Sequence, residues 1–321
     1  MKLLEQLCLA YGPSGAEGCV REQIKNEIAP YADEISVDAL GNLIAHKKGS
    51  GKKIMLAAHM DEIGLMVTYI DDKGFLRFAQ VGWLPPVFTI NRQVRFENGV
   101  KGVVAYEKEM EKELKQAKLF IDIGAKSREE AESMVKVGDC AVMVSEFTEM
   151  NDRVTCKAMD NRAGCYALIK AAQEINSSND IYYVFTTQEE IGLRGAKTAA
   201  FAIEPDLALS VDTTMTGDTP ESDKMAVTLG GGVAIKVMDG SIITNSYLRK
   251  RMIELAQGIP YQLEVLIDGG TDGGTIHTSR GGVMTGGISI PTRYIHSITE
   301  TVDKNDLKNA ITLIKRFCEE V

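Results

Sequence analysis

Two adjacent carboxylates, Glu189 and Glu190, follow the apolar run DIYYVF at a point where a buried strand would end. Successive side chains point to opposite sides of a strand, so in an extended segment the two glutamates would face different ways and could do different chemistry. The pair by itself is equally typical of a solvated strand end. Further residues of the same kind are needed before it indicates a site.

Five more ionisable residues stand in comparable places. They are His59 and Asp61 after KIMLAA, Asp212 at the end of DLALSV, Asp160 before a predicted helix in KAMDNRAG, and His296 after GGISI. Each has an ordinary structural explanation: Asp160 could cap a helix, Asp212 could begin a turn, and His296 could bond to a backbone carbonyl. Coincidence across so many strand ends explains the whole set poorly.

A metal centre explains the set better, because carboxylates that are brought together repel one another unless cations neutralise them. Imidazole and carboxylate groups are also suitable ligands for zinc. The spacing of His59 and Asp61 puts both side chains on one face of an extended segment. There Asp61 can accept a hydrogen bond from the second ring nitrogen of a metal-binding His59, so we expect Asp61 to support a ligand rather than to bind metal itself.

The elements that would position these residues alternate between strands and helices. Ser14 and Glu17 have capping-box spacing before a helix whose apolar face holds Val20, Ile24 and Ile28. Later helices are predicted over 161–175, 245–258 and 303–321, and strands over 54–58, 181–187, 206–214, 261–267 and 282–290. This order predicts an α/β fold with a mainly parallel sheet sandwiched by helices, and ligands gather outside the carboxyl ends of such strands.

Residues 64–155 have a different pattern, with two predicted β-hairpins, a strand, a short helix and a closing strand. We expect a small inserted β-rich domain here, and a discontinuous catalytic domain formed by residues 1–63 and 156–321. A charged stretch, EKEMEKELKQAK at 107–118, is expected to be a solvated loop or helix face.

The composition excludes several classes of protein. The 321 residues are 44% hydrophobic, enough for a large core, and the net charge of -9 argues against a nucleic-acid-binding surface. We expect no secretory leader and no segment long enough to span a membrane. The six cysteines are far apart without a CxxC pair, which is typical of reduced thiols in a cytoplasmic protein.

Six ordered motifs resemble those of the glutamyl aminopeptidase family of two-metal exopeptidases, some members of which are labelled cellulase or endoglucanase. The motifs are AAHMDEIGLMV, KAMDNRAG, QEEIGLRGA, SVDTT, GGTDGGTIH and IPTRYIHS. The resemblance covers essentially the whole chain. It implies a zinc-exopeptidase-like fold and an enzyme that hydrolyses the first peptide bond of short peptides. Each subunit would bind two divalent ions, with zinc or cobalt as the expected metals and manganese as a further candidate. The resemblance also implies that the insert mediates dimerisation and that the dimers form a dodecamer.

The same resemblance implies a role for each site residue. Asp160 would bridge the two ions, His59 and Asp212 would complete one metal site, and Glu190 and His296 would complete the other. Glu189 would be the general base for the attacking water, with Asp61 as the supporting catalytic residue. The sequence departs from the family pattern at 107–118, where relatives carry a Pro-Pro-His segment, and at Val233, which replaces a proline.

Other functions use similar residues. A two-metal deacylase or a carboxypeptidase could use the same ligands, whereas an endoglucanase would need two opposed carboxyl groups on either side of a sugar, which adjacent glutamates suit poorly. A binding role without catalysis would leave the paired glutamates unexplained. A substrate with an acidic N-terminal residue would need a cationic side chain near the site. Arg293 is a candidate for this cation, although a structural salt bridge would explain Arg293 as well.

Overall fold

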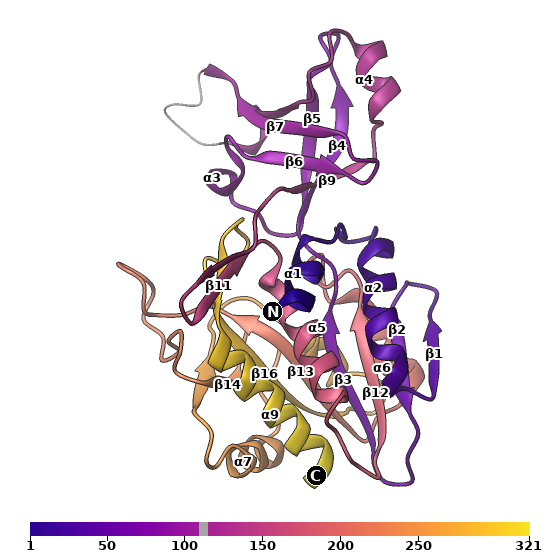
Figure 1. Cartoon of the computed structure of the whole chain (residues 1–321), viewed down its shortest axis with the longest axis vertical. Helices are drawn as coiled ribbons and strands as arrows, with labels where there is room; N and C mark the ends of the chain where they lie inside the picture. The colour runs from indigo at the N-terminus through magenta and orange to yellow at the C-terminus, as the bar shows by residue number, and fades with distance from the viewer. Residues whose placement is uncertain (109–114) are drawn as a thin grey trace.

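The computed structural model describes residues 1–108 and 115–321, and its largest element is an eleven-stranded sheet (Figure 1). Its strands are β1 (Glu34–Val37), β2 (Leu43–Lys47), β3 (Lys53–His59), β10 (Thr148–Met150), β11 (Arg153–Cys156), β12 (Asp180–Thr186), β13 (Leu207–Thr214), β14 (Val233–Met238), β15 (Tyr261–Val265), β16 (Met284–Arg293) and β17 (Glu300–Asp303). Neighbours β12, β3, β13 and β16 run parallel at the centre, and antiparallel pairs continue the sheet at both margins. The expected parallel arrangement therefore holds at the centre of the sheet.

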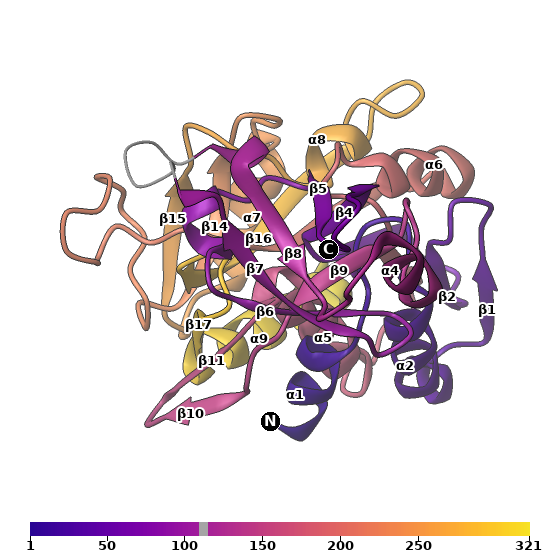
Figure 2. The ribbon, with the colours of Figure 1, turned by 90° about the horizontal axis from the view of Figure 1, so that it is seen from above.

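Helices cover both faces of this sheet. One face carries α1 (Lys2–Leu9), α2 (Gly18–Ile28), α5 (Met159–Ala172), α7 (Ser246–Leu255) and α9 (Lys304–Glu320). The other carries α6 (Arg194–Ile203) and α8 (Gly273–Ile276). Figure 2 shows α6 and α8 on the opposite side of the strands from α5 and α9. The predicted α/β sandwich is confirmed.

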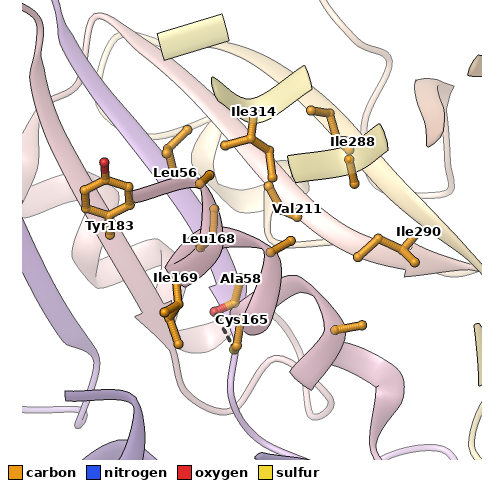
Figure 3. Close-up of a cluster of buried hydrophobic side chains, with 14 of the residues drawn as sticks. Leu56, Ala58, Cys165, Leu168, Ile169, Tyr183, Val211, Ile288, Ile290 and Ile314 are labelled. Carbon is orange, nitrogen blue, oxygen red and sulfur yellow. Dashed lines mark hydrogen bonds between the residues drawn. The ribbon is translucent and has the colours of Figure 1, made fainter. Parts of the chain in front are cut away.

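The central strands are apolar on both faces, as strands covered by helices must be. In β3, Leu56 and Ala58 pack toward α5, whereas Met55 and Ala57 pack toward α6. Figure 3 shows the first of these layers, where Leu168 of α5 lies among the side chains of the strands. A sheet buried on both faces exposes functional side chains only at strand ends and in the loops that follow them.

Residues 64–143 form a separate closed β-barrel above the sheet in Figure 1. Its strands, in order around the barrel, are β4 (Gly64–Ile70), β5 (Leu76–Val81), β8 (Leu119–Asp122), β7 (Lys101–Tyr106), β6 (Gln93–Phe96) and β9 (Cys140–Met143). Helices α3 (Pro86–Thr89) and α4 (Arg128–Met134) and the short 3-10 turn Gln116–Lys118 accompany them. The barrel has its own apolar core, and closure leaves it without free strand edges.

The predicted division into two domains stays a prediction, with one structural fact bearing on its boundary. Strands β10 and β11, which the prediction assigned to the insert, pair through β11 with β17 in the large sheet. The Tyr11 hydroxyl donates a hydrogen bond to the carbonyl of Cys140 in β9 at 2.8 Å. The segment that follows α1 therefore contacts the barrel directly.

Part of the charged stretch 107–118 lies outside the described residues, namely 109–114, and the expected solvated loop or helix face is not described there. At its start, Glu107 pairs with Arg77 at 2.7 Å and with Lys118 at 2.9 Å. No helix within the described ranges is long and apolar enough to cross a membrane. The six cysteines are all free thiols, in agreement with the expectation; the predicted cytoplasmic location stays a prediction.

Candidate active site

The seven residues singled out from the sequence meet at the carboxyl edge of the parallel strands. His59 is the last residue of β3, and its register partner is Thr186, the last residue of β12. The loop that carries Glu189 and Glu190 therefore begins beside His59. Asp212 lies near the end of the neighbouring strand β13, Asp160 lies at the start of α5, and His296 follows β16.

Asp160 lies between the two histidines. His59 Nε2 is 3.2 Å from Asp160 Oδ1 and 3.5 Å from Asp212 Oδ1. His296 Nε2 is 3.5 Å from Asp160 Oδ2 and 3.2 Å from Glu190 Oε2. One carboxylate oxygen of Asp160 thus faces each histidine, and the Nε2 atom of each histidine has a second carboxylate within 3.5 Å, that of Asp212 for His59 and that of Glu190 for His296.

The adjacent glutamates face different histidines, but strand alternation is not the reason. Strand β12 ends at Thr186, and Gln188 has a left-handed φ of 55°, so the chain has already turned before it reaches the pair. Glu190 lies beside His296, whereas Glu189 Oε2 is 3.9 Å from His59 Nε2. That separation is larger than the 3.2–3.5 Å that join the Nε2 atoms of His59 and His296 to the carboxylates of Asp160, Asp212 and Glu190.

Asp61 holds the two glutamates by their backbone. Its carboxylate accepts hydrogen bonds from the N–H groups of Glu189 at 3.1 Å and Glu190 at 3.3 Å, and from the hydroxyl of Ser14 at 2.6 Å. His59 Nδ1 is closer to the main-chain oxygen of Asp61, at 3.2 Å, than to the carboxylate, at 3.5 Å. Asp61 therefore lies beside His59 as predicted, but the hydrogen bond of that ring nitrogen goes to the main-chain oxygen of Asp61, and its carboxylate bonds to the loop of the glutamates and to Ser14.

The predicted capping box at the start of α2 is wrong. Glu17 is the residue before the helix, and its side chain accepts bonds from the N–H groups of Gly15 and Gln188 instead of the helix. Ser14 bonds to Asp61. Both side chains thus support the loop that carries the glutamates.

Glu300 has a similar supporting place on the other side of the site, and the sequence reasoning missed it. Its side-chain oxygens accept the N–H of Asp160 at 2.9 Å and the N–H of His296 at 2.7 Å. The residue is fully enclosed, and burial raises its pKa well above the usual value, with the nearby Asp160 adding to the rise. Glu300 begins strand β17, whose sequence ETVD is mostly polar and gives no sign that the carboxylate is buried.

The cluster carries more negative charge than its histidines can balance. Burial raises the pKa of the carboxyl groups of Glu189, Glu190 and Asp212, because their ionised oxygens are poorly solvated. Burial would lower the pKa of His296, but the carboxylates around it, Glu190 first, outweigh burial and raise that pKa to about 12. Four carboxylates thus outnumber the two histidines beside them, and the set keeps an excess of negative charge unless its carboxyl groups take up protons or bind cations.

These residues fit divalent metal ions. Ligand atoms lie within 4.8 Å of one another in two sets, His59 with Glu189 and Asp212, and His59 with Asp160 and Glu190. One oxygen of Glu190, Oε1, is buried and has no hydrogen-bond partner among the described residues. Such an oxygen is costly unless something pairs with it, and a cation would do so.

A cavity of about 310 Å³ opens onto the cluster. One of its walls includes Trp83, which belongs to the loop between β5 and α3 of the barrel, and whose ring centre lies 5.7 Å from that of His296. The inserted segment therefore takes part in the site. The sequence reasoning missed this contribution, because nothing in the pattern of the hairpin indicates where its loop points.

His277 and Arg293 have partners outside the cluster. One ring nitrogen of His277, Nδ1, lies 2.9 Å from the carbonyl oxygen of Gly273 one helical turn earlier. Arg293 contacts Asp218 through two nitrogens at 3.0 and 2.7 Å, which is the salt bridge that had been the alternative to a substrate-binding role.

Comparison with known proteins gives a consistent picture. The sequence matches the family described as M42 glutamyl aminopeptidase over residues 41–313. A relative from Acetivibrio thermocellus named "Putative aminopeptidase" is 55% identical over 317 residues, which are 97% of this chain and 96% of the relative.

Solved structures agree over the full length. An aminopeptidase from Desulfurococcus kamchatkensis has a TM-score of 0.96 and 40% identity, covering 100% of this chain and 94% of that chain. The TET1 peptidase of Pyrococcus horikoshii, described as able to assemble into a tetrahedron or a large octahedral shell, has a TM-score of 0.91 and 35% identity, covering 100% and 99%. A structure from Thermotoga maritima named endoglucanase is also similar, with a TM-score of 0.85 and 36% identity over 99% and 96%.

Proposed function

The chain belongs to the M42 glutamyl aminopeptidase family, and we propose that it hydrolyses the first peptide bond of short peptides with two divalent metal ions held between His59 and His296. The observation that carries this proposal is the position of Asp160, which presents one carboxylate oxygen to each histidine. A single carboxylate in that position can serve two neighbouring sites. The glycosidase name of one similar structure has no counterpart in this geometry, because the carboxylates gather around histidines instead of flanking a sugar-sized gap.

In this proposal each histidine belongs to one metal site. His59 and Asp212 would hold the first ion, His296 and Glu190 would hold the second, and Asp160 would contribute to both. Zinc and cobalt suit this mixture of imidazole and carboxylate, with manganese as a further candidate. Such a pair of ions supplies Lewis acidity, which makes a water more acidic and a peptide carbonyl more electrophilic.

Glu189 would take the proton from the attacking water and pass it to the departing amine. Its greater distance from His59 leaves it free to contact a reactant, and burial raises the pKa of its carboxyl above the usual value. Asp61 and Ser14 would orient it through the backbone, because Asp61 accepts the N–H of Glu189 and the hydroxyl of Ser14.

The substrate test combines metal removal with a blocked amine. Chelation followed by dialysis should abolish release of the first residue from tripeptides that begin with leucine, lysine or glutamate, and zinc, cobalt or manganese should restore it. The same peptides with an acetylated N-terminus should resist cleavage. Release of the C-terminal residue would indicate a carboxypeptidase, removal of the acetyl group would indicate a deacylase, and full activity after verified metal removal would refute the metal-dependent proposal.

We further propose that the subunit assembles through its barrel into dimers and that the dimers form a dodecamer. The described assemblies of the similar TET1 peptidase support this proposal. Multi-angle light scattering of the metal-loaded protein at micromolar concentration should give a mass of about twelve subunits. A monomer would contradict both steps of assembly, whereas a stable dimer would contradict only the second.

A further inference from the structure

Outside the cluster, the walls of the cavity are mostly apolar, with Thr213 and Thr214 as the polar exceptions. Apart from the residues of the cluster, its large side chains are those of Trp83, Leu193, Met215, Leu266 and Ile295. They come from five separate segments: the barrel loop after β5 and the segments that follow β12, β13, β15 and β16. At about 310 Å³ the cavity has the size of a small ligand pocket.

No lysine or arginine of the described chain lines this cavity. Two arginines lie close to lining residues along the sequence. Arg194 follows Leu193 and donates a hydrogen bond to the side chain of Gln188 at 3.4 Å, and Arg293 makes two contacts with the carboxylate of Asp218. The ionisable residues of the lining are those of the cluster itself, and four of them are carboxylates. An acidic substrate side chain would therefore lose its hydration without gaining a cationic partner from the wall outside the cluster.

We infer that this cavity binds the side chain of the first substrate residue and selects uncharged apolar side chains of the leucine and methionine class over glutamate. The inference rests on the proposed aminopeptidase function, since the cavity receives a side chain only if the free amine end of a peptide reaches the cluster. It assigns specificity to Leu193, Met215, Leu266 and Ile295, with Trp83 closing the barrel side. A basic side chain is disfavoured too, because the apolar wall offers no carboxylate outside the cluster.

Kinetics give the first test. With metal-loaded protein and a panel of aminoacyl p-nitroanilides, kcat/KM for leucine and methionine should exceed that for glutamate by about 100-fold or more, which is the scale of discrimination when a polar group would be left unpaired in a pocket. Lysine should also fall well below leucine. An equal or higher kcat/KM for glutamate or for lysine would overturn the inference.

A matched pair of variants locates the effect in the cavity wall. Met215 is 44% exposed beside the cluster, and Met284 is 43% exposed at the opposite end of the sheet, where β16 begins. Met215→Arg should lower the preference for leucine over glutamate by about two- to fivefold, the size of a partly exposed ion pair. Met284→Arg should leave the preference unchanged. Equal effects of both substitutions would contradict the assignment of the wall.

Binding gives a readout that does not depend on turnover. Trp83 is the single tryptophan of the chain, so its fluorescence reports directly on this cavity. Titration of the metal-loaded protein with free L-leucine should change the emission at concentrations at least about tenfold lower than titration with L-glutamate. A tenfold difference in affinity is the smallest effect expected when one apolar contact in a pocket is lost. Tighter binding of glutamate would overturn the inference. Preferential leucine binding without cleavage of any unblocked peptide would instead refute the proposed function and leave the apolar cavity in place.

Discussion

Replacing Glu189 with glutamine is expected to lower kcat by about 10²–10⁴-fold, the usual contribution of a general base, while the protein keeps its full metal content. Glutamine has nearly the same size and polarity but accepts a proton far less readily. The backbone bond from Glu189 to Asp61 does not involve the side chain, so the loop should stay in place. The measurement is kcat beside elemental analysis of metal per chain.

Glu190→Gln is the matched control, because it changes the next residue in the same way. Glu190 lies 3.2 Å from His296, so the loss of its negative charge should weaken one metal site, and excess metal should recover part of the activity. The opposite pattern, with metal lost from the Glu189 variant and retained in the Glu190 variant, would reverse the two roles. The distances allow this reversal, because a carboxylate oxygen of Glu189 also lies within 4.8 Å of ligand atoms of His59 and Asp212.

Replacing Asp160 with asparagine should have the widest effect on metal. Its two oxygens face His59 and His296, so the loss of this one charge affects both proposed sites. We expect metal affinity to fall more than about 100-fold, beyond the usual cost of removing a supporting group, and activity to fall with it. Competition with a chelator of known affinity would measure the change.

Asp206→Asn serves as the control for that variant. Asp206 immediately precedes β13, at the opposite end of the sheet, where its side chain accepts the N–H of Lys53 at 2.8 Å. Its replacement should leave metal affinity unchanged. Unaltered metal binding in the Asp160 variant would refute a bridging role for that residue.

The central sheet and the gathering of the site residues at its edge could be predicted from the sequence because both depend on local patterns. Strands covered on both faces, such as β3 and β13, must be continuously apolar, and a His or Asp where such a run ends stands out. Parallel strands bring their carboxyl ends to one edge, so residues as distant as His59 and Asp212 could be placed together without knowing any contact.

The supporting residues could not be found in the same way. Ser14 and Glu17 have the spacing of a capping box, but tertiary contacts with Asp61 and Gln188 outweigh the local pattern. Glu300 acts through backbone N–H groups, which leave no trace in the sequence of their partners. The contribution of Trp83 depends on how the barrel sits on the sheet, and periodicity along a single segment carries no information about that.

His46 shows the same limit in a simpler case. Its position before a lysine- and glycine-rich turn predicts a surface residue. In the structure its ring stacks on Tyr182 at 4.0 Å and contacts Asp180 at 2.6 Å, and only 15% of its side chain is exposed. The prediction was wrong because the antiparallel pairing of β2 with β12 covers the ring, and that pairing joins segments far apart in the chain.

Titration of the metal-free protein tests the central claim most directly. Zinc or cobalt would be added in steps, and bound metal per chain and the rate of N-terminal residue release from an unblocked peptide would be measured in the same samples. The account predicts that the rate is at background without metal and reaches its maximum when two ions are bound per chain. A full rate without metal, or a maximum at one ion per chain with no second ion bound, would contradict it.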